Sequence, residues 1–359
     1  MARSSTTFLN KWRNGKTTVI RVPAVFSQKV VTYALMLDAD DAFQTNSQES
    51  FGVYRTAENT TLDSPINIAA VPQRSPFRYP GGKTWLIPYI RTWLSRQPQK
   101  PTVLIEPFAG GGIVGLTAGF EKLASHVVLG EKDENVASVW TAILWGQSEW
   151  LAETIENFSL TRRNVLSVLE RQPQTQREKA FATILRNRVQ RGGIMAAGAG
   201  LVKNGENGRG ISSRWYPHTL AKRIRAIADL KERFSFSHQD GLELIEAYLD
   251  DEDTAFFVDP PYTKAARRLY QHWQIDHRKL FSLLSRVKGD VLLTYDDSKE
   301  IKNLALEYGF QTQTVMMKNT HHAKMMELLV GKNLSWLKAA KAYRESMSQT
   351  HQASLELLP

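Results

Sequence analysis

The segment Ala255-Phe256-Phe257-Val258-Asp259-Pro260-Pro261-Tyr262 joins four apolar residues to a proline-rich turn that begins with a carboxylate. A short unbroken apolar run before a turn is typical of a strand that is buried on both faces. Such strands occur in parallel sheets covered by helices, and these sheets bind ligands at the carboxyl ends of their strands. The segment therefore predicts an α/β fold with Asp259 at the ligand-binding edge.

Strand and helix patterns alternate around this segment, as in a parallel sheet whose strands are connected by helices. We expect a helix over 83–96 and strands over 103–106, 127–130, 255–258, 291–295 and 311–317. Helical, charge-rich sequence and a stretch rich in Gly and Ala interrupt this alternation at 148–235. The order predicts a Rossmann-like α/β domain over 71–147 and 236–335, with a mostly helical insertion at 148–235.

The two ends of the chain have different patterns. Residues 17–22 form a β-branched run that is followed by an apparent helix and then by a polar stretch. We interpret this N-terminal extension, 1–70, as an arm packed on the domain or, alternatively, as half of a ribbon-helix-helix unit that binds DNA. Residues 336–359 are expected to form a helical tail, to which the sequence assigns no role.

The composition favours a polyanionic partner. The chain has 46 Lys and Arg residues against 36 Asp and Glu, which gives a formal charge of +10. Because each neutralised phosphate releases counterions, nucleic acid is the favoured partner of such a chain. No apolar run approaches the ~20 residues of a membrane span, and no signal peptide is apparent, so we expect a cytoplasmic protein with no membrane partner.

The absence of cysteine excludes disulfides, thiolate zinc sites and a cysteine nucleophile of the kind used in the methylation of base carbons. The pair His321-His322 has no further ligand at metal-binding spacing, so we expect no metal cofactor.

The turn Asp259-Pro260-Pro261-Tyr262 carries the most specific chemical signal. An exocyclic amine such as adenine N6 is a weak nucleophile, because its lone pair is delocalised into the ring. The Asp259 carboxylate can accept one N–H of such an amine and the Pro260 carbonyl the other, in a loop that the prolines stiffen. Tyr262 offers a stacking face, and the base must leave the double helix to reach it. The alternative is an ordinary proline-rich turn after a strand.

A second loop, Glu106-Pro107-Phe108-Ala109-Gly110-Gly111-Gly112, also follows an expected strand and opens a helix. Glycines let a ligand lie against the backbone, and a carboxylate there can hold a cationic amino group. Gly110, Gly112 and Gly115 also satisfy the spacing G-x-G-x-x-G, with Glu131 placed to bind a ribose. A nicotinamide or flavin enzyme is therefore an alternative interpretation of this loop.

A third motif, Arg78-Tyr79-Pro80-Gly81-Gly82-Lys83, precedes the first expected strand. Its glycine turn and lysine suggest a phosphate loop, but the spacing and the preceding strand of a nucleotide triphosphatase are missing. We reject that function.

In this order the three motifs resemble those of the Dam-like adenine DNA methylases, the alpha arrangement of amino-methyltransferases, over residues 75–333. The resemblance implies a Rossmann-like S-adenosylmethionine-dependent methyltransferase sheet, a target-recognition insertion and direct methyl transfer to a flipped adenine in double-stranded DNA. It also implies two sets of site residues. The catalytic set is Asp259, Pro260, Pro261 and Tyr262, and the cofactor-binding set is Tyr79, Lys83, Glu106, Phe108, Gly110, Gly112, Glu131 and Asp240.

The chain departs from the family pattern at Ala109, and it has Glu131 where Asp is commoner; neither change removes a functional group. The insertion resembles the family's DNA-contacting region only faintly, but it is rich in arginine and glycine. Arginines can bind phosphates or read guanine edges, so we expect Arg188, Arg191 and Arg214 to contact DNA. Solvated helix faces are the alternative explanation of these arginines.

Other functions stay open at this stage. The same pocket could serve cytosine N4, an adenine in RNA or a protein glutamine, although glutamine methylases usually resemble Asn-Pro-Pro-Tyr and this chain has Asp259. An answer of a different class is a non-catalytic DNA-binding regulator that keeps the fold, against which the intact Asp259 and Tyr262 argue. The target sequence, the oligomeric state and the existence of a partner restriction endonuclease stay open as well.

Overall fold

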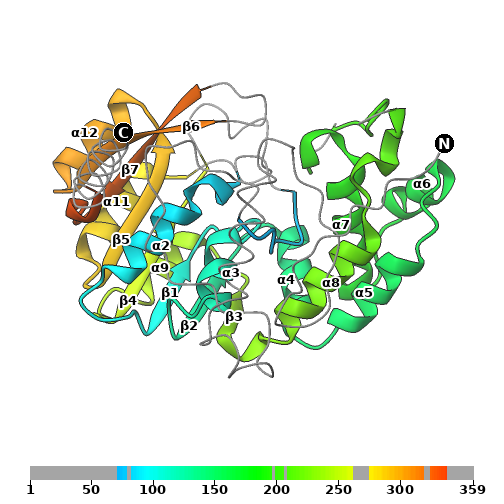
Figure 1. Cartoon of the computed structure of the whole chain (residues 1–359), viewed down its shortest axis with the longest axis horizontal. Coiled ribbons are helices and arrows are strands. Elements are labelled where there is room, and N and C mark those ends of the chain that lie inside the picture. The colour runs from blue at the N-terminus through cyan, green and yellow to red at the C-terminus, as the bar shows by residue number, and fades with distance from the viewer. Residues whose placement is uncertain are drawn as a thin grey trace, which may run out of the picture. The chain divides into compact units, whose positions relative to one another are not determined.

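One seven-stranded sheet organises the described part of the chain. The computed structural model describes residues 71–78, 82–195, 199–205, 208–261, 275–318 and 324–337. Across the sheet the strand order is β3 (Phe234–Ser237), β2 (His126–Gly130), β1 (Val103–Glu106), β4 (Thr254–Val258), β5 (Asp290–Asp296), β7 (Lys324–Gly331) and β6 (Gln311–Lys318) (Figure 1). The order reverses between β1 and β4, which is the switch point where doubly wound sheets bind ligands.

Five of these strands are parallel, and the last two form a hairpin. β1 pairs in parallel with β2 and β4, while β3 pairs with β2 and β5 with β4 in the same direction. β7 runs antiparallel to both β5 and β6. All five parallel strands therefore end at one edge of the sheet, and β7 begins at that edge. This topology confirms the Rossmann-like α/β expectation.

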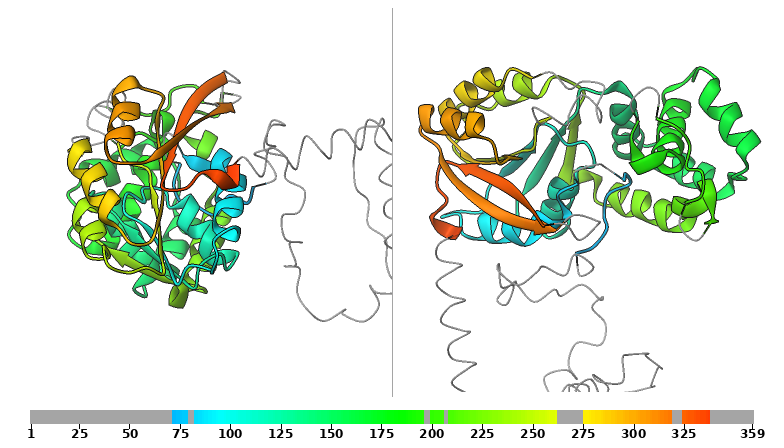
Figure 2. Two further views of the ribbon diagram at one scale, coloured as in Figure 1. Left: turned by 90° about the vertical axis from the view of Figure 1, so that its left-hand side faces the viewer. Right: turned by 90° about the horizontal axis from the view of Figure 1, so that it is seen from above.

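The central strands bury alternate side chains on opposite faces. Leu104 and Phe257 belong to one apolar cluster, whereas their neighbours Ile105 and Phe256 belong to another. Because both faces are buried, these strands have the continuous apolar sequence that predicted them. Helices cover both faces (Figure 2): on the first lie α2 (Ile87–Ser95), α3 (Ile113–Phe120) and α4 (Glu134–Leu144), and on the second lie α9 (Gly241–Glu246), α11 (His277–Arg286) and α12 (Lys299–Glu307).

The insertion is helical, as expected, and packs on α4. Its helices are α5 (Ser148–Asn157), α6 (Arg162–Glu170), α7 (Gln176–Val189) and α8 (Pro217–Ala228), which Figure 1 shows on the right. Thr175 and Glu178 form a reciprocal capping box that starts α7. Ile184 of α7 and Ile224 of α8 belong to the same apolar cluster as Trp140 of α4. The insertion therefore shares its core with the helices that cover the sheet.

Two strands and one helical stretch differ from the sequence-based expectation. β3 was not expected, because its Phe-Ser-Phe-Ser alternation spans only four residues at the edge of the sheet. β7 was not expected either, since Glu327 interrupts its apolar pattern. Within the stretch that was expected to be helical, residues 148–170 form two helices, because Thr161 starts α6 as its N-cap. The expectations for residues 1–70 and for the tail beyond 337 lie outside the described residues.

No helix in the described ranges is both long and apolar enough to cross a membrane.

Candidate active site

Four acidic residues stand at the carboxyl ends of neighbouring parallel strands. Glu106 ends β1, Glu131 follows β2, Asp240 comes shortly after β3, and Asp259 follows β4. Glu106 and Asp259 flank the switch point, and the charge of Asp259 contributes to the raised pKa of Glu106. The structure thus places these four predicted site residues along one edge of the sheet.

A buried lysine connects the first glycine turn to Asp259. Lys83 starts the short 3-10 helix η4 (Lys83–Leu86) and is 5% exposed. Its Nζ lies 2.9 Å from Asp259 Oδ1 and 3.3 Å from Glu327 Oε1. Burial disfavours the ammonium, but the two carboxylates outweigh burial and raise the pKa of Lys83. Lys83 is therefore a cation between two carboxylates at neutral pH.

Strand β5 supplies a second donor to the same carboxylate. The buried hydroxyl of Thr294 donates a 2.9 Å hydrogen bond to Asp259 Oδ1. About a quarter of the Asp259 side chain, 24%, stays accessible. Two donors hold one oxygen in place while part of the carboxylate faces outwards, so Asp259 has the fixed geometry that an acceptor for a bound ligand needs.

The backbone of the glycine-rich loop takes conformations that favour glycine. Gly110 and Gly112 have φ values of 48° and 61°, in the left-handed region. Gly112 is the N-cap of α3, and a Cβ there would lie 2.9 Å from the ring of Trp140. The indole N–H of Trp140 also donates to the Gly110 carbonyl at 3.0 Å. Trp140 thus supports a loop that leads into the N-terminus of a helix, where anions and polar groups bind.

Glu106 and Glu131 hold this loop from both strand ends. Glu106 Oε2 accepts the Gly115 N–H at 2.7 Å, and Glu131 Oε2 accepts the Gly110 N–H at 3.0 Å. Burial raises the pKa of Glu106 to about 8 and that of Glu131 to about 7. Buried carboxyl groups with raised pKa values at a strand edge are typical of a binding site.

Asp240 is the N-cap of α9 and is tied to Lys132. Its Oδ1 accepts the Leu242 N–H at 2.9 Å, and its Oδ2 lies 2.7 Å from Lys132 Nζ. Burial would raise the pKa of Asp240, but these partners outweigh burial and lower it. Capping explains this residue without a ligand, so its role in cofactor binding stays a prediction.

The remaining predicted site residues are only partly described. Phe108 is partly buried and packs with the second apolar cluster, where a Cβ on Gly241 would lie 2.6 Å from its ring. Pro260 is buried and Pro261 is half-buried, directly after Asp259. Tyr79 and Tyr262 lie outside the described residues.

The sequence model of the D12 class N6 adenine-specific DNA methyltransferases matches residues 79–319. The chain belongs to this family. It is an adenine-specific DNA methyltransferase that uses S-adenosylmethionine as its methyl donor, and the resemblance seen in the motifs is confirmed. No curated protein sequence gives a match.

Similar solved structures include two methyltransferases. One is a Pyrococcus horikoshii protein assigned as an RNA methyltransferase, with a TM-score of 0.33, 11% identity and coverage of 77% of this chain and 92% of that one. The other is the B. subtilis tRNA methyltransferase TrmK, with a TM-score of 0.29, 11% identity and coverage of 74% and 86%. These scores are low, and the strand order establishes the fold instead.

In this methyltransferase the insertion holds the segment that leads into the first glycine turn. Asn187 of α7 is fully buried; its Oδ1 accepts the Arg78 N–H at 2.8 Å, and its Nδ2 donates to the Arg78 carbonyl at 2.9 Å. The same Nδ2 donates to the Gly193 carbonyl at 3.0 Å. Arg188 donates to the Pro76 carbonyl at 2.5 Å. The sequence predicted a DNA contact for Arg188, and its hydrogen bond to the Pro76 carbonyl was not expected.

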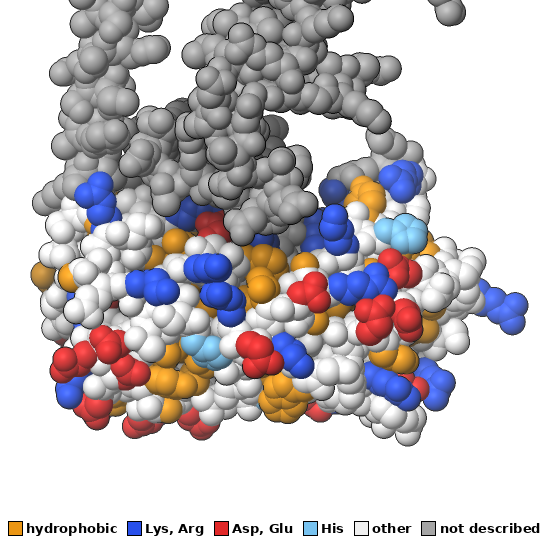
Figure 3. All heavy atoms as spheres, turned by 60° about the horizontal axis from the view of Figure 1, so that its bottom comes forward, with side chains coloured by type: hydrophobic (Ala, Val, Ile, Leu, Met, Phe, Trp, Pro, Cys, Tyr) orange, Lys and Arg blue, Asp and Glu red, His pale blue; other side chains and the backbone are white. Residues whose placement is uncertain are grey.

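The predicted DNA contacts have different surroundings. Arg188 is 7% exposed, whereas Arg191 is exposed and Arg214 is half-buried. Burial and the charges of Arg223, Arg78 and Arg214 lower the pKa of Arg188. Four guanidinium groups therefore create a positive potential where the insertion meets the segment 76–78. On the face drawn in Figure 3, by contrast, the visible basic and acidic side chains are interspersed.

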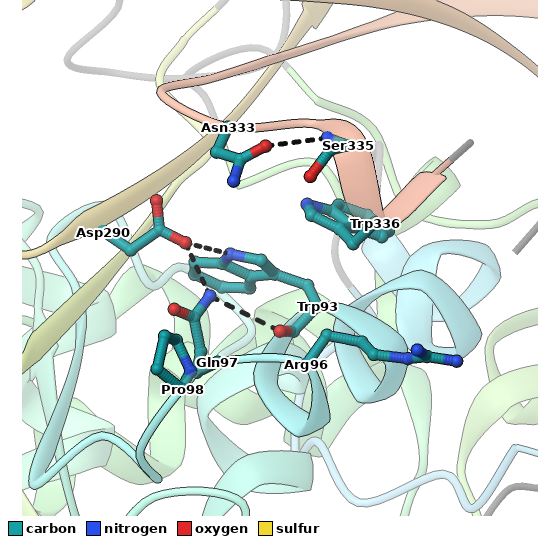
Figure 4. A pocket seen from close by; sticks show the side chains of 8 residues that line it. All are labelled: Trp93, Arg96, Gln97, Pro98, Asp290, Asn333, Ser335 and Trp336. Carbon is teal, nitrogen blue, oxygen red and sulfur yellow. Dashed lines mark hydrogen bonds between the residues drawn. The ribbon is translucent and has the colours of Figure 1, made fainter. Parts of the chain in front are cut away.

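A cavity of about 280 Å³ lies near the opposite end of the sheet, where β5 begins with Asp290. Figure 4 shows Trp93 and Gln97 directed at the Asp290 carboxylate, with Trp336 beside them. The indole N–H of Trp93 and the side-chain amide of Gln97 donate to Asp290 Oδ2, at 2.8 and 2.5 Å, so this carboxylate supports α2. The cavity is therefore separate from the active-site edge.

Sequence reasoning missed Glu327 and placed Thr294 only within an expected strand, 291–295. Neither belongs to a motif, and each faces Asp259 or Lys83 only through strand pairing. Among the described residues, no group of three or more His, Asp or Glu side chains could hold a metal ion.

Proposed function

We propose that Asp259 and the carbonyl of Pro260 accept the two N–H groups of the target adenine. The observation that carries this proposal is the fixed position of Asp259, which Lys83 and Thr294 anchor at the switch point beside Glu106. Pro260 and Pro261 restrict the backbone after Asp259, so the two acceptors keep one relative orientation. Tyr262, outside the described residues, would stack on the base.

The acceptor pair activates the amine directly. S-adenosylmethionine supplies a methyl group on a sulfonium. The N6 lone pair would form the new N–C bond, the electron pair of the broken C–S bond would stay on sulfur, and the amine would lose one proton to the surrounding water. Hydrogen bonds to Asp259 and Pro260 draw electron density towards N6 as this charge develops. No covalent bond between the protein and the base is required.

The residues at the strand edge fit S-adenosylmethionine. The left-handed glycines Gly110 and Gly112 let the loop turn into the N-terminus of α3, and the buried carboxyl groups with raised pKa values match a cationic ammonium and a ribose diol. We assign Glu106 and the Phe108–Gly112 loop to the methionine part and Glu131 to the ribose. Tyr79 and Lys83 would line the pocket, and Asp240 would contact the adenine of the cofactor.

The insertion, 148–235, is the proposed target-recognition region, and the enzyme is proposed to flip its target adenine out of the duplex. A base inside the helix cannot reach the Asp259 turn, so extrusion follows from the chemistry. The positive potential around Arg188 and Arg214 supports phosphate binding beside the segment 76–78, and the exposed Arg191 follows α7 in the insertion. Arg188 would act mainly by holding the segment at Pro76.

Incorporation of a labelled methyl group tests this assignment. The enzyme is incubated with S-adenosylmethionine carrying a labelled methyl group and with duplexes of varied sequence. We expect transfer by the unaltered enzyme and none by Asp259→Ala. Asp250→Ala is the matched control, because Asp250 is exposed and pairs only with Lys288 among the ion pairs described. Full activity of Asp259→Ala would overturn the assignment.

A further inference from the structure

A third charged group completes the environment of Asp259. Glu327 of β7 is 4% exposed, and its Oε1 lies 3.3 Å from Lys83 Nζ. Lys83 in turn lies 2.9 Å from Asp259 Oδ1. Two carboxylates therefore share one ammonium at the centre of the site. The motifs of the sequence include Lys83 and Asp259 but not Glu327.

The hairpin strand β7 brings Glu327 to this position. Glu327 pairs with Asp296 of β5, and Leu329, two residues on, pairs with Thr294. Paired residues of antiparallel strands lie on the same face, and so do residues two apart in one strand. Glu327 and Thr294 thus share the face of the sheet that η4 covers, since Leu329 and Leu86 belong to one apolar cluster. Glu327 reaches Lys83 from β7, and Thr294 reaches Asp259 from β5.

We propose that Glu327 is a positioning residue for methyl transfer, which shares the Lys83 ammonium so that Asp259 keeps its acceptor strength towards the target amine. This inference rests on the assignment of Asp259 as the acceptor. With Glu327 the three groups carry one net negative charge; without it, Lys83 and Asp259 would form a neutral pair. A carboxylate that is neutralised by its own buried lysine is a weaker acceptor for an incoming N–H.

The surroundings explain why two carboxylates can be held so close together. Like charges at short range disfavour each other in a buried site, and Lys83 between them offsets this repulsion. Glu106 and Tyr295 also interact with the charge of Asp259, and Asp296 pairs with Glu327 across the two strands; none of these three groups adds positive charge. Lys83 contacts both carboxylates, so a change in one carboxylate alters how strongly Lys83 binds the other.

The variant Glu327→Gln tests the charge of Glu327 while it preserves its size and one acceptor oxygen. We expect the rate of a single turnover, with S-adenosylmethionine and duplex DNA both saturating, to fall by about tenfold or more. The dissociation constants for the cofactor and for DNA should change by less than about twofold, because the proposal concerns the transfer step. Glu307→Gln is the matched control, since Glu307 is an exposed partner of Arg278.

Two further variants separate a positioning role from a structural one. Glu327→Asp keeps the charge and should recover most of the rate, even if its melting temperature is as low as that of Glu327→Gln. In a Lys83→Met background, Glu327→Gln should have little further effect on the rate, because the ammonium that it shares is gone.

An unaltered single-turnover rate in Glu327→Gln would overturn the inference. It would also be overturned if Glu327→Gln lowered the rate by the same factor in the unaltered and in the Lys83→Met background. If the unaltered enzyme does not methylate adenine, it is the assignment of the site that fails instead.

Discussion

The hydroxyl of Thr294 and the ammonium of Lys83 both bind the same oxygen of Asp259, Oδ1, at 2.9 Å. The two donors come from opposite ends of the domain sequence, one from β5 and one from the turn before β1. An acceptor that must face a weakly nucleophilic amine gains from such fixing, because no reorganisation is needed during the reaction. The predictions below follow from this arrangement and from the glycine loop beside it.

Replacing Thr294 by Val removes a hydrogen-bond donor to Asp259 and nearly preserves the shape of the side chain. We expect the single-turnover rate to fall by roughly tenfold, because one hydrogen bond to a charged group is lost near the reacting atoms. Thr312→Val on the exposed side of β6 is the control. An unchanged rate in Thr294→Val would show that this donor does not contribute to the transfer step.

Cofactor binding should depend on pH through Glu106 and Glu131. Burial raises their pKa values to about 8 and about 7, so both are partly protonated at neutral pH in the cofactor-free enzyme. An ammonium and a ribose diol favour the carboxylate forms, so affinity should rise from pH 6 to pH 9 and binding should release protons. Calorimetry in buffers of different ionisation enthalpy measures that release. Affinity independent of pH over this range would contradict the cofactor assignment.

The raised pKa of Glu106 predicts that stability falls as pH rises, whereas cofactor affinity rises. A carboxyl group whose folded pKa is raised contributes stability that is present below its unfolded pKa, near 4.5, and is lost as pH rises through its folded pKa, near 8. The cofactor-free variant Glu106→Gln should therefore melt at a higher temperature than the unaltered chain at pH 9, by about 2–4 °C for each kcal/mol gained. At pH 4.5 this advantage should vanish. A lower melting temperature at pH 9 would show that the Glu106 carboxylate is not destabilising in the folded state.

Gly115 should tolerate no side chain without a loss of cofactor affinity. A Cβ at this position would lie 2.6 Å from Leu129 and 2.7 Å from Glu106 Oε2, which Gly115 itself binds through its N–H. Gly115→Ala should displace Glu106 and weaken S-adenosylmethionine binding by about tenfold. Gly200→Ala is the control, since a Cβ there meets nothing within 4 Å. Equal affinity of both variants would separate Glu106 from cofactor binding.

Arg214 and Arg188 should differ in what they contribute to DNA binding. Loss of one phosphate contact lowers the slope of log affinity against log salt by about one, and we expect this of Arg214→Ala. Arg188→Ala should also lower the melting temperature, because Arg188 is buried and holds the Pro76 carbonyl. Arg278→Ala on α11 should leave the salt slope unchanged. If Arg214→Ala gives the same slope as the unaltered enzyme, Arg214 does not bind a phosphate.

The sequence predicted the parts of the site that local motifs carry. Continuous apolar strands followed by Glu106 and Asp259 predicted the ligand-binding edge of the sheet, because a strand buried on both faces has a distinctive composition. Glu327 could not be found in this way, since a single acid in an apolar strand gives no sign of its partner. Lys83 and Glu327 lie near opposite ends of the domain sequence, and only the pairing of β7 with β5 brings them together.

The insertion was predicted less completely for a related reason. Its helical content was evident from the sequence. The spacing of apolar residues in α7 does not reveal that Asn187 and Arg188 point inwards and bind the backbone of Arg78 and Pro76. Polar residues at such positions look like surface residues until the segment that they hold is known. The sequence therefore indicated which arginines gather in the insertion but not which of them are buried.

The central claim is that the Asp259 carboxylate activates the adenine amine, and Asp259→Asn tests it most directly. This variant keeps the size of the side chain and one acceptor oxygen but removes the charge. With cofactor and duplex DNA both bound at saturation, we predict that the single-turnover rate falls by about a thousandfold while both dissociation constants stay near those of the unaltered enzyme. A rate within a few-fold of the unaltered enzyme would contradict the account.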